Sequence, residues 1–321
     1  MYKQQAILEW LQKMNKPIAM AVAQRTDLEE IRIRARQPVR VRAGGKEWLV
    51  TRTGLLTKED ATQPVLILQE QELNNMFLSM NENSVYAYQE EVKQGYLTIK
   101  GGHRVGIAGK IVPASDGSIQ YIKEISGLNI RIAKAVQGCG KCILPHILKN
   151  SHDIYNTLIV SPPGTGKTTL LRDLTRILSD GSTSPPFCGV NVGVVDERSE
   201  IAACYKGVPQ NDVGKRTDVL DGCPKAIGML MLLRSMAPTV IAVDEIGGTG
   251  DAEAIRQVAN AGVRLLATAH GYGETGLSDL RKEAKDLIAE GIFQKVIVLD
   301  GHQGVGTIKQ VLDGGAAYGI A

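Results

Sequence analysis

The first half of the chain alternates between helical and extended hydrophobic patterns. Apolar side chains recur at helical spacing over residues 7–14, which Pro17 follows, and again over residues 73–80. Between residues 31 and 42 they alternate instead with arginines, with the period of two that is typical of a strand. Gly101-Gly102 separates two further alternating runs, which is a hairpin signal. This order predicts an N-terminal helix and then an α+β domain with an antiparallel sheet.

The second half repeats a different unit, a short apolar, β-branched run followed by a helical stretch. The runs lie at residues 157–160, 190–195, 240–243, 264–268 and 295–299, and helices are expected from about residue 167 and over about 225–236, 251–261 and 277–290. Such alternation favours right-handed βαβ units around a buried parallel sheet. The predicted fold class is therefore α/β, with a mostly parallel sheet in the C-terminal domain and a smaller α+β domain before it. We place the domains at residues 1–26 (N-terminal helix), 27–135 (α+β) and 136–321 (α/β).

The strongest chemical signal lies between a predicted strand and a predicted helix, in the segment Ser161-Pro162-Pro163-Gly164-Thr165-Gly166-Lys167-Thr168-Thr169. Inward-pointing loop amides and the N-terminus of the next helix hold a phosphate chain. In such a loop the glycines let the backbone approach, the lysine reaches the β- and γ-phosphates and the next hydroxyl serves Mg²⁺. The expected ligands are ATP and Mg²⁺. The candidate binding residues are Pro163, Gly164, Thr165, Gly166, Lys167, Thr168 and Thr169.

Acidic side chains follow two other predicted strands. Asp244 and Glu245 end the run 240–243, which brings them to the same sheet edge as the glycine-rich loop. We expect Asp244, with Thr168, to serve Mg²⁺ and Glu245 to orient or deprotonate a water molecule, which favours hydrolysis. Asp196 and Glu197 follow another strand and could serve metal or water, or form an acidic cluster at a helix N-terminus. His270 could sense the γ-phosphate or be a polar residue at a strand end.

Composition narrows the choice of function. Glycine makes up 35 of 321 residues, about 11% against a typical 7%, which fits a site built from backbone amides. Aromatic residues are only 4% of the chain, which disfavours a surface for stacking single-stranded nucleic acid. We expect no transmembrane segment, because no apolar run approaches the roughly 18 residues that a span needs. The N-terminus lacks the apolar core of a signal peptide, so a cytoplasmic protein is expected.

Charge and cysteine content add two expectations. Residues 1–150 carry 21 Lys and Arg against 14 Asp and Glu, a net charge of +7, and the remainder carries 16 against 20, a net charge of −4. This asymmetry suggests two domains with different surfaces that face each other across subunits. The odd number of five cysteines suggests reduced thiols, and the pair Cys139 and Cys142 has no second close pair that would complete a zinc site.

These motifs together resemble a known superfamily. The order of glycine-rich loop, acidic segment, strand with Asp-Glu, and final histidine is similar to that of the type II/IV secretion and pilus-retraction ATPases, which have a P-loop, RecA/AAA-like domain. The segments that carry this resemblance after the loop are Val195-Asp196-Glu197-Arg198-Ser199-Glu200, Val243-Asp244-Glu245 and Leu265-Leu266-Ala267-Thr268-Ala269-His270-Gly271. Residues 101–109, 125–133 and 195–201 more closely resemble the stage III sporulation AA family of endospore-forming bacteria. Two departures stand out, Ser161 in place of the first glycine and Asp244 where many secretion ATPases have glycine.

The resemblance implies more than the residues alone. It implies a homo-hexameric ring in which the N-terminal domain of one subunit lies over the ATP site of the next, with arginines that complete that site. On the matching motifs the candidates are Arg104 and Arg131, although each also suits a purely structural place in an alternating strand. It further implies an integral membrane component of a secretion-like channel as partner, with the protein peripheral on the cytoplasmic, mother-cell face of a membrane.

Two other functions remain open at this point. The basic first half and the alternating arginines favour a ring ATPase driven by nucleic acid, although we consider nucleic acid an unlikely partner. That arginine face could also be solvated or form a subunit interface, and it comprises Arg32, Arg34, Arg36, Arg40 and Arg42. The last alternative is a nucleotide-gated assembly scaffold with little turnover, against which Glu245 argues.

Overall fold

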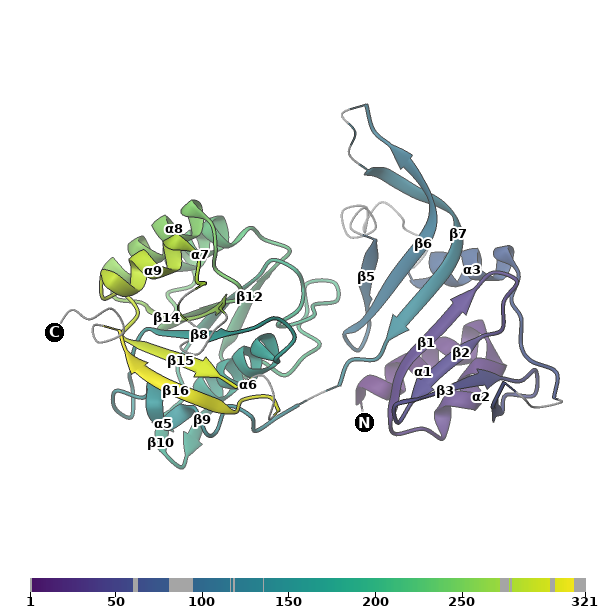
Figure 1. Cartoon of the computed structure of the whole chain (residues 1–321), viewed down its shortest axis with the longest axis horizontal. Helices are drawn as coiled ribbons and strands as arrows, with labels where there is room; N and C mark the ends of the chain where they lie inside the picture. The colour runs from purple at the N-terminus through teal and green to yellow at the C-terminus, as the bar shows by residue number, and fades with distance from the viewer. Residues whose placement is uncertain are drawn as a thin grey trace. The chain divides into compact units, whose positions relative to one another are not determined.

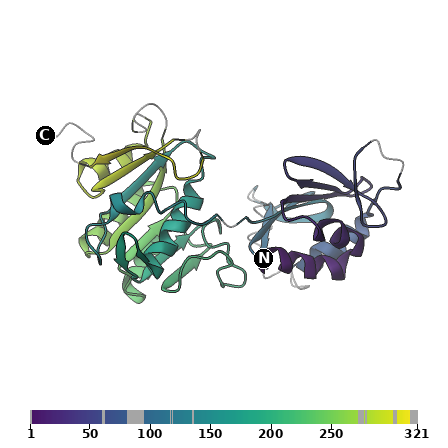
Figure 2. The same cartoon turned by 90° about the horizontal axis from the view of Figure 1, so that it is seen from below.

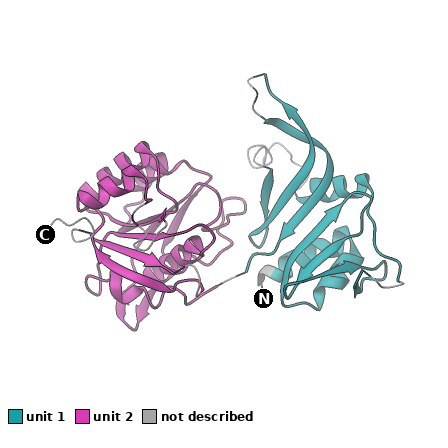
Figure 3. Cartoon of the chain, in the orientation of Figure 1, with its two compact units in different colours: residues 1–134 teal, residues 135–321 magenta. Residues whose placement is uncertain are grey.

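The chain folds into two compact units, residues 1–134 and 135–321 (Figure 3). The computed structural model describes residues 2–59, 63–80, 95–115, 117, 119–134, 136–271, 277, 279–300 and 304–314. Each unit has a hydrophobic core of its own. We therefore describe the units separately.

The first unit is built on an antiparallel sheet of seven strands in the order β4-β3-β2-β1-β7-β6-β5 (Figure 1). The strands are β1 (Leu28–Arg34), β2 (Arg40–Ala43), β3 (Lys46–Val50), β4 (Leu56–Thr57), β5 (Tyr96–Ile99), β6 (His103–Pro113) and β7 (Ile119–Arg131). Helices α1 (Tyr2–Met14), α2 (Lys16–Ala23) and α3 (Glu70–Met80) bury their apolar stripes in the same core as the sheet. The expected hairpin at Gly101-Gly102 is confirmed, since β5 and β6 pair antiparallel across it.

The first helix ends before Pro17, as the sequence pattern predicts, but a second helix that the pattern missed begins at Lys16. Helix α1 ends at Met14, and Asn15 then caps α2 by accepting a hydrogen bond from the N–H of Ile18 at 3.1 Å. Pro17 lies in the first turn of α2, where its missing N–H costs nothing. Proline therefore begins a second helix here, which packs in the core of the first unit.

The second unit contains a sheet of seven strands in the order β12-β11-β13-β14-β8-β15-β16, all parallel except β16. The strands are β8 (Thr157–Ser161), β11 (Val192–Asp196), β12 (Thr217–Asp221), β13 (Val240–Val243), β14 (Arg264–His270), β15 (Lys295–Leu299) and β16 (Ile308–Asp313). A separate hairpin joins β9 (Gly181–Thr183) to β10 (Pro186–Cys188). Both the parallel sheet and the antiparallel sheet before it are as predicted, so the α/β fold class is confirmed.

Helices cover both faces of the parallel sheet (Figures 1 and 2). The helices are α5 (Leu144–Ile147), α6 (Lys167–Asp180), α7 (Lys225–Ser235), α8 (Thr249–Asn260) and α9 (Lys282–Ala289). Helices α5 and α6 share one apolar cluster with the sheet, and α7, α8 and α9 share the other. Among the described residues, no helix combines the length and the apolar character that crossing a membrane requires.

Candidate functional site

The glycine-rich loop connects β8, an interior strand of the parallel sheet, to helix α6. Two of its glycines lie in the left-handed region, Gly164 with φ 76° and Gly166 with φ 89°, where other residues are strained. Gly166 also caps α6, and a Cβ atom there would lie 2.6 Å from the side chain of Val305. The buried Ser161 lies outside the set of residues with positive φ, which explains why serine is tolerated at the first position. The loop thus has the local geometry that a phosphate cradle requires.

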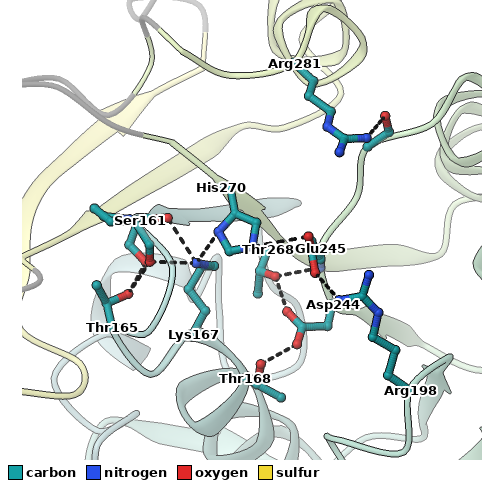
Figure 4. Close-up of polar contacts among 12 residues, drawn as sticks. Ser161, Thr165, Lys167, Thr168, Arg198, Asp244, Glu245, Thr268, His270 and Arg281 are labelled. Atoms are coloured by element: carbon teal, nitrogen blue, oxygen red, sulfur yellow. Dashed lines mark hydrogen bonds and ion pairs between the residues drawn. The ribbon is translucent and has the colours of Figure 1, made fainter. Parts of the chain in front are cut away.

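Lys167 lies at the centre of the site with its ammonium fully hydrogen-bonded (Figure 4). Its Nζ donates to the carbonyl oxygens of Ser161 at 3.0 Å and Pro162 at 2.9 Å, and lies 2.9 Å from Nδ1 of His270. An ammonium has three N–H donors and no acceptor, so Nδ1 of His270 is the acceptor in the third contact. All three protons of Lys167 are therefore used within the chain.

Burial has a large effect on this lysine. Only 6% of Lys167 is exposed, and burial lowers the pKa of its ammonium from 10.5 to about 8. The charges of Asp244 and Glu245 act in the opposite direction but do not cancel the effect. Lys167 is thus a cation held in a poorly solvated position, where an added phosphate charge would stabilise it strongly.

Asp244, directly after β13, connects the loop helix to strand β14. Its Oδ2 accepts a hydrogen bond from the hydroxyl of Thr168 at 2.5 Å, and its Oδ1 accepts one from Thr268 (Figure 4). A hydroxyl and a carboxylate side by side are oxygen ligands of the kind that Mg²⁺ prefers. Thr168 and Asp244 therefore fit a shared magnesium ion in chemistry and in position.

Glu245 is fixed at its backbone and at both carboxylate oxygens. Its φ of 53° is unusual for a non-glycine residue, and its N–H donates to the hydroxyl of Thr268 at 2.8 Å. Oε1 lies 3.2 Å from Nε2 of His270, and Oε2 lies 3.0 Å from Nη1 of Arg198. Because Nδ1 of His270 accepts from Lys167, its Nε2 is the nitrogen that carries the proton, and it faces Oε1 of Glu245. The histidine thus connects the lysine to the glutamate.

Asp196 and Glu197 have partners of a different kind. Asp196 is 2% exposed and accepts hydrogen bonds from three consecutive backbone N–H groups, those of Glu200, Ile201 and Ala202, at 2.8–3.0 Å. Burial raises the pKa of this carboxyl, and the three N–H donors act to lower it. Glu197 forms an ion pair with Lys225 at the start of α7. Asp196 therefore holds the loop after β11 in place, at the edge of the site.

The structure brings the predicted residues of the second unit to one edge of the sheet. They lie at the ends of β8, β11, β13 and β14, as βαβ topology requires. Three members of the network were not singled out from the sequence, namely Arg198, Lys225 and Thr268. Arg198 and Thr268 belong to segments with recognisable motifs, but only the fold shows which carboxylates they contact.

Arg104 and Arg131 lie in the first unit, directly opposite each other on β6 and β7. The guanidinium of Arg104 stacks 3.6 Å over the ring of Tyr96. Arg131 is exposed and lies opposite Glu30 on its other side. The two arginines therefore present a common basic spot on one face of the sheet.

Most of the other arginines share one face of the sheet, but they lie on two paired strands and not on one extended stretch. The chain turns back at Arg36, where φ is 59°, and the antiparallel pairing places Arg32 beside Arg40. Four of the five have carboxylate partners, and these ion pairs are Arg32–Glu30, Arg36–Glu70, Arg40 with Glu47 and Glu59, and Arg42–Glu29. The expectation of five arginines on one extended stretch was wrong, because periodicity cannot show the turn. The paired carboxylates leave less positive charge for a polyanion than the sequence suggested.

The cysteines do not assemble a metal centre in the part of the chain that the structure describes. No group of three or more His, Cys, Asp or Glu side chains there has the arrangement of a metal site. Burial and the charge of Asp173 raise the pKa of Cys139 to about 11, which keeps this thiol protonated. Cys142 donates to the carbonyl oxygens of Cys139 and Gly306, both at 3.3 Å.

Comparison with known proteins assigns the chain to a family. A family model described as sporulation stage III, protein AA matches residues 1–317. The chain belongs to this family. It is 42% identical to stage III sporulation protein AA of Bacillus subtilis (strain 168) over 290 residues, which are 89% of this chain and 87% of that protein. The suspected resemblance to the stage III sporulation AA family is thereby confirmed.

Solved structures show the wider fold relationship. The pilus retraction motor PilT with bound ADP matches 92% of this chain and 78% of its own, with a TM-score of 0.55 and 15% identity. The Legionella pneumophila ATPase DotB matches 92% of this chain and 75% of its own, with a TM-score of 0.52 and 14% identity. At such low identity the stage III sporulation AA family shares a fold with these ATPases, and activity has to be argued from the site.

Proposed function

We propose that this chain is an ATP-hydrolysing ring motor that powers or gates a membrane-embedded channel during sporulation. The observation that carries the proposal is the convergence of a glycine loop, a buried lysine, a Thr–Asp pair and a fixed glutamate at one sheet edge. Family membership and the shared fold with PilT and DotB support it. We take each part of the site in turn.

ATP binds with its phosphates in the loop between β8 and α6. The backbone at Gly164 and Gly166 and the N-terminus of α6 supply N–H groups and a positive dipole end. Lys167 exchanges at least one of its three acceptors, Nδ1 of His270 among them, for a phosphate oxygen, since its three N–H groups are already used. Contact with the phosphate compensates the cost of burying the ammonium.

Thr168 and Asp244 hold Mg²⁺ together with the phosphates. When bound, the ion offsets phosphate charge and fixes the phosphate geometry. Asp244 is kept in place by Thr268 while it serves this role. The contribution of the protein is a small set of oxygen ligands that are already oriented.

Glu245 orients the attacking water or takes its proton. Its carboxylate lies at the same sheet edge as Lys167, from which it is separated by the ring of His270. When Lys167 turns to a phosphate, His270 loses the donor to its Nδ1, so the histidine reports phosphate binding to Glu245. This gives His270 the role of a γ-phosphate sensor.

The ring and its arginines form the finer part of the proposal. We assign Arg104 and Arg131 to the ATP site of a neighbouring subunit, where a guanidinium would neutralise charge on the γ-phosphoryl oxygens. The opposite net charges of the two halves of the chain favour such contacts between copies. The motor would act from the cytoplasmic, mother-cell side on an integral membrane component of a secretion-like channel.

Steady-state ATP hydrolysis tests the proposal. Purified protein with ATP and Mg²⁺ should release phosphate, with a rate per subunit that rises with protein concentration as rings form. Lys167→Ala should abolish turnover, whereas Glu245→Gln should bind ATP without hydrolysing it. Lys149→Ala, which removes an exposed lysine paired with Asp153 at 3.9 Å, is the matched control and should leave the rate unchanged. A rate that survives Lys167→Ala would refute the assignment.

The competing proposal is a motor that acts on nucleic acid. The same ATP hydrolysis assay, with DNA or RNA added, tests it. Stimulation by DNA or RNA, with binding that weakens steeply with salt, would favour a nucleic-acid motor. We expect no stimulation of ATP hydrolysis, because Arg32, Arg40 and Arg42 are paired with carboxylates. A scaffold that binds ATP with little turnover would instead tolerate Glu245→Gln in sporulating cells.

A further inference from the structure

The carboxylate of Glu245 has a fixed orientation that one exposed arginine helps to set. Nη1 of Arg198 contacts Oε2 at 3.0 Å, and Nε2 of His270 contacts Oε1 at 3.2 Å, from two other strand ends (Figure 4). The backbone of Glu245 is fixed separately, by its N–H bond to Thr268. Three contacts therefore determine where this carboxylate points. The two contacts to its oxygens differ, because His270 is also hydrogen-bonded to Lys167.

The backbone that carries Arg198 is itself rigid. It follows Asp196, whose carboxylate holds three loop amides, and precedes Ser199, which has a φ of 52° and donates to Asp221 at 2.7 Å. Arg172 adds two further hydrogen bonds, to the carbonyl oxygens of Glu200 and Ile201. The side chain of Arg198 therefore extends to Glu245 from a backbone that is held in place.

The ion pair contributes little to stability. The side chain of Arg198 is 62% exposed and that of Glu245 is 34% exposed, and ion pairs between such exposed side chains contribute little to folding stability. Misplacing a reacting group by 1 Å, in contrast, can cost about 100-fold in rate. An effect of Arg198 on turnover would therefore reflect the orientation of Glu245 and leave folding almost unchanged.

We propose that Arg198 is a positioning residue that fixes the carboxylate of Glu245 for its work on the attacking water. The inference rests on the proposed function and adds to it a residue that the sequence motifs did not single out. Arg198 acts through Glu245 and does not hold ATP. Its removal should therefore change kcat and leave KM nearly the same.

The experiment compares steady-state kinetics of three variants with the wild type. Arg198→Ala should lower kcat by about 10-fold to 100-fold and leave KM for ATP within about two-fold. Arg198→Lys keeps the charge without the planar fork and should recover part of the loss. The matched control is Arg256→Ala, which removes an arginine of the same unit paired with Glu290 at 2.7 and 2.8 Å. It should have wild-type kinetics.

A double-variant cycle shows whether Arg198 acts through Glu245. In a Glu245→Gln background, Arg198→Ala should cause no further loss of the residual single-turnover rate. The same fractional loss in both backgrounds, an unchanged kcat, or a raised KM with normal kcat would each overturn the inference. Matching melting temperatures of the arginine variants exclude misfolding as the cause. If Glu245→Gln leaves the ATPase rate intact, the proposed function itself fails. If Glu245→Gln stops turnover but Arg198→Ala does not change kcat, only the inference about Arg198 fails.

Discussion

Binding of ATP should weaken as the pH rises from 7.5 to 9, because Lys167 loses its proton in this range. Burial lowers the pKa of its ammonium from 10.5 to about 8 in the unbound protein. In the complex, phosphate oxygens beside Nζ favour the charged form and move its pKa above the range. The bound state therefore holds up to one proton more than the free state, a difference that grows with pH, so the affinity must fall as the pH rises.

The size of the effect follows from the fraction of protein in which Lys167 is protonated. With a pKa of about 8, that fraction falls from about three quarters at pH 7.5 to about one tenth at pH 9, so Kd should rise about eight-fold. The corresponding free energy is about 1.2 kcal/mol. The thiols of the half-buried Cys139 and the buried Cys204 do not interfere, since burial raises the pKa of Cys139 to about 11 and that of Cys204 to about 12.

Equilibrium titration of the wild-type protein with a fluorescent, nonhydrolysable ATP analogue measures this dependence without hydrolysis and keeps the charge of Glu245, which acts on the pKa of Lys167. The control is Lys167→Arg, because arginine keeps its proton throughout the range and should flatten the profile. A constant Kd between pH 7.5 and 9, or an equal slope in the arginine variant, would show that the lysine does not titrate as its burial requires. Tighter binding at high pH would refute the reasoning outright.

Three further outcomes test the site and the ring. Gly166→Ala should lower the free energy of unfolding by about 1–3 kcal/mol and weaken ATP binding, because φ is 89° and Val305 lies 2.6 Å from the new Cβ; Gly164→Ala, with open space around its Cβ, should cost less in urea unfolding. Asp196→Asn should cost about 1–3 kcal/mol in the same assay, because it weakens the acceptor of three buried loop amides; loss of activity at unchanged stability would instead indicate a direct role in catalysis. Mixing inactive Arg131→Ala and Lys167→Ala subunits should restore part of the ATPase rate if the arginine acts in a neighbour's site, and no recovery would contradict that role.

The parallel sheet was largely predictable, because its buried strands are continuous apolar runs. The strands that the sequence missed lie at the sheet edges, where one side is exposed. Thr217–Asp221, with three polar residues among its five, lies at one edge, and Ile308–Asp313 pairs antiparallel at the other. The helix that begins at Lys16 was missed for a local reason, because only the capping hydrogen bond of Asn15 shows that Pro17 lies in a first turn.

The site was predictable down to its strand ends but not to its side-chain contacts. Topology alone requires that Asp244 and Glu245 meet the glycine-rich loop. Topology does not show that Arg198 contacts Glu245, or that the carboxylate of Asp196 accepts hydrogen bonds from loop amides. Both contacts depend on how one irregular loop folds back. Contacts that depend on loop conformation have no periodic signal in a sequence.

The internal hydrogen bonds of the site have a thermodynamic consequence for assembly. Lys167, Thr168 and Asp244 all have partners within the chain, so ATP binding exchanges bonds and does not simply add them. Hydrogen bonds to charged groups contribute only about 1.5–3 kcal/mol each, so contacts from outside the subunit would add substantially to the binding energy. If Arg104 and Arg131 of a neighbour provide those contacts, then by linkage ATP must strengthen assembly by the same factor by which assembly strengthens ATP binding. ATP affinity should therefore rise with protein concentration, and Arg131→Ala should abolish that rise while leaving the weak affinity of dilute subunits unchanged.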